Sequence, residues 1–282
     1  QSPYVQNRVY QLLREEKNPF VLLNLALSTE ELFLYFPPNT HLEAPVELIL
    51  EGTGISVPRA HIVVGRGSSV SFKVIHRGSG FMNSLIDVTV EENAKVSFVE
   101  KSTHSGTLYY SLRSVQKRDS SLFHITHEDQ TAVSRRDFHA KLVGENGSVK
   151  LLGLSELENR EAHTHILVAH VAPHCYSSQH FKSIVRASGK VSFYGTIYVH
   201  PEAQKTDAYQ LSSALLLDEK ALAFSEPNLR IFADDVKATH GATVGQLDEE
   251  QLFYLRARGL GALEAKELLV QGFANEILEQ LP

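Results

Sequence analysis

One short segment of the chain gathers residue types that carry acid–base and metal chemistry. Asp234, Asp235, Lys237 and His240 lie close together, and Gly241 follows them directly, where glycine lets the backbone bend. His240 can bind a metal through a neutral imidazole nitrogen, and iron accepts histidine when cysteine is lacking. One imidazole alone binds a metal weakly, so a complete site would need further ligands. The alternative is a structural hydrogen bond in the turn beside Gly241.

The adjacent carboxylates of this segment suggest a different chemistry. Paired carboxylates perform acid–base catalysis in carbohydrate-active enzymes, some of which are β-helix proteins. Adjacent residues on a strand point to opposite faces, so Asp234 and Asp235 would need a bulge to act together. We favour a structural turn network, in which one of them forms an ion pair with Lys237 or accepts from helix-end N–H groups.

A second segment is rich in histidine. It contains a set of side chains that suggests a zinc or iron site: His163, His165, His170, His174, Cys175 and His180. On an unbroken strand His163 and His165 share one face and His170 lies on the other, so the histidines cannot all converge. We therefore expect most of these imidazoles to fill stacked strands or to face outward from them.

Cys175 is the single cysteine of the chain. An intramolecular disulfide is therefore impossible, as is a cluster site built from four cysteines of this chain, and a reducing cytoplasmic compartment is favoured. No neighbouring cation stabilises a thiolate at this position, so we expect a buried small hydrophobe. The alternative is a lone thiol that carries sulfur.

Composition narrows the possible partners. The 282 residues are 43% hydrophobic and carry a net charge of −6, which disfavours electrostatic binding to nucleic acid or to an anionic membrane. No apolar stretch approaches the ~20 residues that span a bilayer, and the N-terminus lacks a secretory signal pattern. These features predict a soluble cytoplasmic protein, and the start at Gln1 suggests numbering that begins inside a longer gene product.

The elements that must position these side chains form a long repetitive region. From about residue 41 to residue 235, short alternating runs of β-branched and aromatic residues are separated by turn residues. A recurring pattern places its first apolar residue at Val70, Val96, Leu122, Val149 and Val191. The steps are 26, 26, 27 and 42 residues, and we interpret the last as two short turns or one turn with an insertion.

A steady step of this size without room for helices predicts a β-solenoid, because each coil buries its inner face only when the next coil stacks on it. A sandwich or barrel of antiparallel hairpins is the rival fold. Asn146-Gly147 is the single two-residue hairpin signal of the Asn-Gly or Asp-Gly type, which disfavours that rival.

Helical segments are expected at both ends. Residues 3–17 have the spacing of an amphipathic helix, and the apolar runs at 20–27 and 31–36 fit buried strands or short packed segments. Near the other end, Asp248 can cap a helix that closes at Gly259.

Beyond Gly259, apolar residues spaced mostly by three to five predict an amphipathic helix pair, or one helix loosened at Gly272. We divide the chain into an N-terminal helical or irregular segment (1–40), a β-helix core (41–246) and a C-terminal helical domain (247–282).

Three ordered motifs carry a resemblance to a known family. They are VAPHCYSSQHFKSIV (171–185), AQKTDAYQLSSALLL (203–217) and PNLRIFADDVKATHGATVGQLDEEQLFYLRARGL (227–260). Together they resemble the SufB/SufD family of the SUF iron-sulfur cluster assembly system. The resemblance implies a mainly β fold, a right-handed parallel β-helix with a C-terminal helical domain and a short N-terminal helical segment.

Within that family the chain resembles the SufD-like branch. SufB-like sequences carry a cysteine where this chain has Ala221, and a His-Glu pair where it has His240-Gly241. Many SufD-like sequences have a cysteine where this chain has Ala238. His240 is therefore the remaining candidate ligand for a transient iron-sulfur cluster, or for iron, shared with a partner.

The resemblance also implies an assembly. A SufB-like subunit would pair with the last solenoid strands, and a SufC-like ABC ATPase would dock on the C-terminal helices. The candidate docking residues are Leu252, Phe253, Leu268, Leu269 and Phe273. The chain has no GxxxxGK[ST] phosphate loop, so we expect a non-catalytic scaffold subunit coupled to a partner ATPase. The alternatives are a carbohydrate-active β-helix enzyme that uses Asp234 and Asp235, and a structural homodimer.

Overall fold

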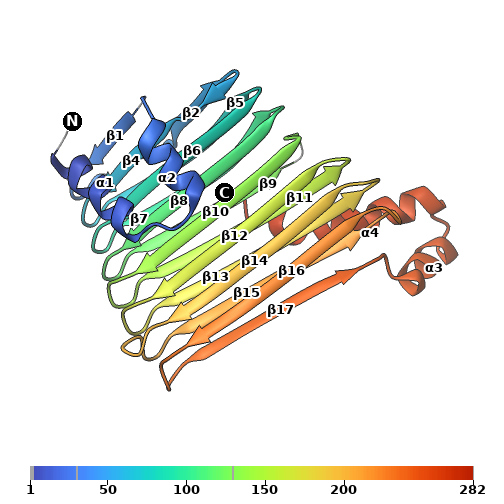
Figure 1. Cartoon of the computed structure of the whole chain (residues 1–282). Coiled ribbons are helices and arrows are strands. Elements are labelled where there is room, and N and C mark those ends of the chain that lie inside the picture. The colour runs from blue at the N-terminus through green and yellow to red at the C-terminus, as the bar shows by residue number, and fades with distance from the viewer. Residues whose placement is uncertain (1–2, 30, 129, 282) are drawn as a thin grey trace.

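The chain winds into a parallel β-solenoid with helices at both ends (Figure 1). The computed structural model describes residues 3–29, 31–128 and 130–281, and side chains from Val5 onward. Successive strands alternate between two sheets, and within the described residues one sheet has nine strands and the other eight. Each coil therefore contributes one strand to each sheet over most of the length. The mainly β prediction is confirmed.

The strands of the solenoid divide between two sheets, here called sheet A and sheet B. Sheet A consists of β1 (Glu31–Phe36), β3 (Ile55–Ser56), β4 (Arg59–Val64), β6 (Phe81–Val90), β8 (Thr107–Gln116), β10 (Val133–Leu142), β12 (Glu161–His170), β14 (Lys190–Val199) and β16 (Leu222–Ile231). Sheet B consists of β2 (Val46–Gly52), β5 (Ser69–Gly78), β7 (Lys95–His104), β9 (Ser121–Glu128), β11 (Ser148–Glu158), β13 (Tyr176–Arg186), β15 (Asp207–Leu216) and β17 (Lys237–Gly245).

The strand register tests the predicted repeat directly. The three steps from Val70 to Val149 are confirmed, since each residue of that series is the register partner of the next. The interpretation of the fourth step is wrong. Val149 pairs with Ser177 on β13, whereas Val191 lies on β14 in sheet A. Both sheets present the same apolar alternation toward the core, so the pattern alone did not separate one sheet from the other.

The hairpin rival is excluded for the described strands, because every pair among them is parallel. Asn146-Gly147 lies in the turn between β10 and β11, which connects the two sheets. The equivalent turns one and two coils earlier place Asp119 and Asn93 in the same left-handed conformation, with φ near 58° in all three. Asn and Asp tolerate this conformation better than other side chains, which explains their recurrence.

The interior is a stack of inward-facing side chains. Alternate residues of strands such as β5 and β7 are buried, and aromatic rings lie above one another along the axis, as for Phe72 and Phe98 with centroids 5.0 Å apart. Full burial of such a side chain contributes roughly 1.5–3 kcal/mol. The coils are therefore held together by hydrophobic contact as well as by ladder hydrogen bonds.

Two helices lie on the outer face of sheet A near the N-terminal end, α1 (Pro3–Glu15) and α2 (Pro19–Leu27) (Figure 1). The first was predicted. The second replaces the expected strand or short segment, because Asn18 caps the Phe20 N–H and Pro19 occupies the first turn. The run at 31–36 forms strand β1.

The C-terminal region holds α3 (Glu249–Ala257) and α4 (Ala262–Leu278). Asp248 caps α3 as predicted, by accepting from two backbone N–H groups. The second segment is one helix that continues through Gly272, and it packs on the outer face of sheet B over Leu152 and Leu154. None of the helices in the described part of the chain combines the length and apolar character needed to cross a bilayer.

Candidate functional site at the open end of the solenoid

His240 lies on the terminal strand of sheet B. Strand β17 pairs with β15 on one side, and within the described residues no strand pairs with its other edge. His240 is the register partner of Gln210, and its side chain is exposed. The residue identified by motif position therefore lies where the solenoid ends and a further coil or a partner strand has room to pair.

The face that carries His240 follows from the alternation of burial on β15. Ala208, Gln210 and Ser212 are buried and face the interior. Their register partners on β17 include His240, which therefore continues an interior column of side chains. The imidazole is exposed because the column ends there. A group bound to His240 would lie over the mouth of the solenoid interior.

The carboxylates Asp234 and Asp235 lie in the bend between β16 and β17, and both are exposed. Asp235 forms an ion pair with Lys205 rather than with Lys237, and its N–H donates to the Gln204 side chain at 3.0 Å. These contacts fix a turn between neighbouring coils. They have the structural role that we favoured, although the expected partners, Lys237 or helix-end N–H groups, were wrong, and they give no support to the carbohydrate-active alternative.

Most histidines of the second segment have separate local partners. His163 contacts the Ser192 hydroxyl at 2.7 Å on the outer face, and buried His170 contacts the Ser177 hydroxyl at 2.8 Å. Burial lowers the pKa of His170 to about 4. In the described part of the chain, no three His, Cys, Asp or Glu side chains are grouped so that they could hold a metal ion.

Cys175 lies in the hydrophobic core of the solenoid. Its Sγ lies 3.3 Å from the Gly144 carbonyl oxygen, to which the thiol donates. Burial raises the pKa of Cys175 to about 11. A thiol in this environment is a poor nucleophile, which agrees with a packing role.

The candidate docking residues divide into two groups. Phe253 on α3 and Leu268 on α4 are exposed, at 74% and 47% of their full surface. Phe273 faces the solenoid, where the Lys182 ammonium lies 4.2 Å from its ring centroid. The same ammonium bonds the Phe273 carbonyl and the Glu276 carboxylate, at 3.2 Å and 2.7 Å. Lys182 therefore attaches α4 to β13, a role that the sequence did not indicate.

A groove of about 460 Å³ runs between α3, α4 and the last strands of sheet B. Its apolar lining includes Leu247, Leu268 and Leu269, and Asp248 and Gln251 lie at its border with α3. Leu268 is thus both exposed on α4 and part of the wall of a hollow beside β17.

Comparison with known proteins identifies the family of the chain. Residues 48–273 match the family described as SUF system FeS cluster assembly, SufBD core domain. The chain belongs to the SufBD family.

Three curated relatives illustrate the range of similarity. A SufBD family protein of Synechocystis sp. is 31% identical over 93% of this chain and 62% of its own length. The SufD protein of Escherichia coli is 38% identical over 53% of this chain and 36% of its own. A SufBD family protein of Mycobacterium leprae is 32% identical over 73% and 55%. This SufD-like chain therefore aligns with roughly one third to two thirds of each relative's length.

Inside this SufBD solenoid lies a charged network that sequence analysis missed. Arg136 binds Glu100 with Nη2 2.8 Å from Oε1, and its Nη1 binds Glu128. Burial would raise the pKa of Glu100, but the charge of Arg136 and the nearby His76 ring, whose Nδ1 lies 3.5 Å from Oε1, outweigh burial and hold that pKa below its usual range. Burial also lowers the pKa of His124, beside Glu100, to about 4.

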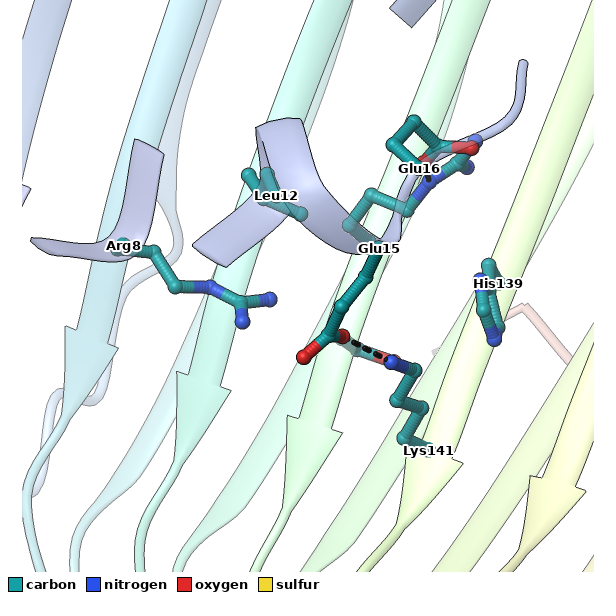
Figure 2. A pocket seen from close by; sticks show the side chains of 8 residues that line it. Arg8, Leu12, Glu15, Glu16, His139 and Lys141 are labelled. Atoms are coloured by element: carbon teal, nitrogen blue, oxygen red, sulfur yellow. Dashed lines mark hydrogen bonds and ion pairs between the residues drawn. The ribbon is translucent and has the colours of Figure 1, made fainter. Parts of the chain in front are cut away.

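A second charged group connects α1 to sheet A (Figure 2). Figure 2 shows Glu15 at the end of α1 bonded to Lys141 on β10. Nearby, Arg113 binds both Glu16 and Asp137 at 2.6 Å. These acids neutralise the cations on the outer face of sheet A. The ion pairs that line the hollow under α1 therefore hold the helix on the sheet.

Proposed function

We propose that this chain is a SufD-like scaffold subunit for iron-sulfur cluster assembly, non-catalytic by itself. It pairs with a SufB-like subunit at the open end of the solenoid and docks a SufC-like ABC ATPase through α3 and α4. The observation that carries the proposal is the placement of His240, exposed on the terminal strand of a SufBD-family solenoid.

The surface around this end fits a protein partner. Among the residues that the structure describes, no strand pairs with the outer edge of β17, so its backbone groups can pair with a strand of another chain. On β16 and just after it, Leu222, Phe224 and Phe232 are each more than half exposed. Exposed large apolar side chains along a terminal strand favour contact with a partner protein.

The cargo is a transient iron-sulfur cluster or iron, shared with the partner. His240 supplies one neutral nitrogen ligand, and a single imidazole leaves the other coordination positions to groups of the SufB-like chain. Cargo held this way binds firmly only when both subunits are present, and it is released when the interface opens.

ATPase docking is supported by exposed apolar residues on the helices. Phe253 and Leu268 are available to a partner, whereas Phe273 is engaged with Lys182. Through Lys182, a force applied to α4 would reach β13 directly. The helices are thereby suited to transmit movement of an ATPase to the coils near His240.

The cluster role is tested by reconstitution with SufB-like and SufC-like chains. We expect His240→Ala to leave the melting temperature unchanged and to lower the yield of assembled cluster, measured by visible absorbance and iron content. His174→Ala is the matched control, because His174 is an exposed histidine in a turn far along the chain from His240. Full yield with His240→Ala, or with a complex that lacks this chain, would contradict the proposal.

The docking role is tested by capture of the ATPase. Phe253→Asp and Leu268→Asp place a charge on the exposed helix surface, and each is expected to weaken capture at least about tenfold if its contact is central to the interface. Tyr10→Asp on α1 is the control, because Tyr10 is 65% exposed, between Leu268 and Phe253, and lies at the other end of the molecule (Figure 1). Unchanged capture by both helix variants would remove the docking surface from the proposal.

A further inference from the structure

One interior column of sheet B changes character toward the open end. Its residues are consecutive register partners: Phe72, Phe98, His124, Leu151, Gln179, Gln210 and His240. The first part is aromatic or aliphatic except for His124, whereas two amides precede His240. Inward-facing amides at two successive coils are unusual for a position that hydrophobic side chains fill elsewhere in the same column.

Both amides are buried, and among the described residues their polar atoms make no hydrogen bonds. Gln179 is 1% exposed and Gln210 is 2% exposed. Within the described part of the chain, neither the nitrogen nor the oxygen of either amide has a hydrogen-bond partner. An unsatisfied buried polar group costs roughly 1–3 kcal/mol, and a leucine at the same position would avoid that cost. Within the described residues, the Gln210 amide is therefore available to a polar side chain on the next coil of the column.

The opposite sheet makes room for one of them. A Cβ atom on Gly195 of β14 would lie 2.4 Å from Nε2 and 2.6 Å from Cδ of Gln210. The three nearest atoms to that Cβ all belong to Gln210. The absence of a side chain at Gly195 thus lets the Gln210 amide lie across the solenoid interior, directly below the coil that carries His240.

We propose that Gln210 is a positioning residue for His240. Neighbouring strands lie about 4.8 Å apart and these two side chains share a face, so the amide can reach the imidazole ring. The Gln210 carbonyl, which has no partner among the described residues in this conformation, would turn to accept the N–H of the neutral ring and would leave the second nitrogen with its lone pair toward the exposed side. Second-shell hydrogen bonds of this kind fix the tautomer of a ligating histidine.

The functional part of this inference rests on the proposed function, and the hydrogen bond is tested without it. In the isolated chain labelled with ¹⁵N-histidine, His240 is assigned by the resonances lost in His240→Gln. We expect the wild-type ring nitrogens to report one dominant tautomer at pH 7.5. Gln210→Leu should shift them toward a mixed population, while Gln179→Leu, one coil deeper, should leave them unchanged.

Gly195→Ala provides an independent perturbation. The added Cβ displaces the Gln210 amide while both Gln210 and His240 stay in place. We expect the same ring-nitrogen shift as for Gln210→Leu, with a melting temperature that shows the fold intact. In the reconstituted complex, both variants should lower cluster yield, up to about tenfold, and Gln179→Leu should not.

The outcomes are distinct. Ring-nitrogen shifts unchanged by Gln210→Leu and Gly195→Ala overturn the inference, even if cluster yield falls, because the loss would then be structural. Shifts as predicted support it. If the shifts appear but His240→Ala retains full yield, the hydrogen bond stands and the proposed function fails.

Discussion

The buried charge network predicts a large loss of stability from one substitution. Arg136 is held by Glu100 in a two-armed contact, with Nε and Nη2 at 3.1 Å and 2.8 Å from Oε1, and by Glu128 on the other side. All three side chains are at most 3% exposed. Arg136→Met keeps much of the side-chain volume and leaves two carboxylates without their cation.

The loss of unfolding free energy can be worked out from the two states open to each carboxylate, charged without its cation or protonated. At an effective dielectric constant near 20, an ion pair at 4 Å contributes about 4 kcal/mol, which Arg136→Met removes. Protonating one of these glutamates at pH 7 costs about 4 kcal/mol, because the ordinary pKa of glutamate lies near 4.3. Partial relaxation of the structure around the two carboxylates reduces the destabilisation. We expect a loss of about 3–5 kcal/mol of unfolding free energy, the range for removing one partner of a buried ion pair.

The loss should also depend on pH. In the native network the pKa of Glu100 is held low, so its stabilisation is present above the unfolded pKa and fades as pH falls toward the folded one. Without Arg136, burial dominates and raises that pKa above the unfolded value. The destabilisation by Arg136→Met should therefore increase as pH rises from about 5 to 8.

The assay is urea denaturation followed by circular dichroism at several pH values. Arg135→Met is the matched control, since Arg135 is the half-buried neighbour outside this network, and we expect a change within about 0.5 kcal/mol. Adding Glu100→Gln to Arg136→Met should recover part of the loss. A loss below about 1 kcal/mol, or one that is flat with pH, would refute the reasoning.

Three further predictions follow from other buried groups. Because burial raises the pKa of Cys175 to about 11, iodoacetamide at pH 8 should alkylate it on the order of 100-fold more slowly than glutathione, and rapid labelling would contradict this. Lys182→Met should speed hydrogen exchange of α4 by an amount equivalent to about 1–3 kcal/mol, whereas Lys190→Met, which breaks an exposed pair, should not. Because burial lowers the pKa of His170 to about 4, its contribution to stability should fall as pH drops from about 6.5 toward 4, and His170→Gln should flatten that slope in acid denaturation.

The solenoid was predictable from the sequence because each coil repeats the same burial problem. Three successive steps near 26 residues were confirmed in register, whereas Val191 was placed one half-coil out of phase. An inward position on sheet A and one on sheet B carry the same alternation, so periodicity reports the coil length and not the sheet. The segment at 20–27 was ambiguous because a continuous apolar run fits either a buried strand or a helix.

The candidate site was only partly accessible to the same reasoning. His240 was located by its motif, and the structure adds that it ends an interior column. The sequence did not predict the contact between Gln210 and Gly195, because these residues lie on different strands and are brought together only when the coil closes. Likewise, Glu100 and Arg136 are 36 residues apart and were indistinguishable in sequence from polar residues on an outer face.

The free edge of β17 allows the proposed pairing surface to be tested through one backbone group. The Lys237 N–H donates to the Thr206 carbonyl at 2.8 Å, in the turn that leads into β15. Because N–H groups alternate in direction along a strand, that of Ala242 points to the outer edge. Ala242→Pro removes an outward donor while the ladder to β15 is kept, and proline is tolerated at such edges. Ala242→Ser retains the donor and is the control.

We expect the isolated wild-type chain and Ala242→Ser to form a homodimer through this edge at high micromolar concentration, because an unpaired last coil can be extended by a second copy. Light scattering should show Ala242→Pro shifted toward monomer, and capture of a SufB-like subunit should weaken in parallel. A dimer that tolerates the proline would show that self-association uses another surface. If Ala242→Pro captures a SufB-like subunit as well as the wild type does, the interface between the two subunits does not use the edge of β17. The proposed position of His240 between the subunits would then be wrong.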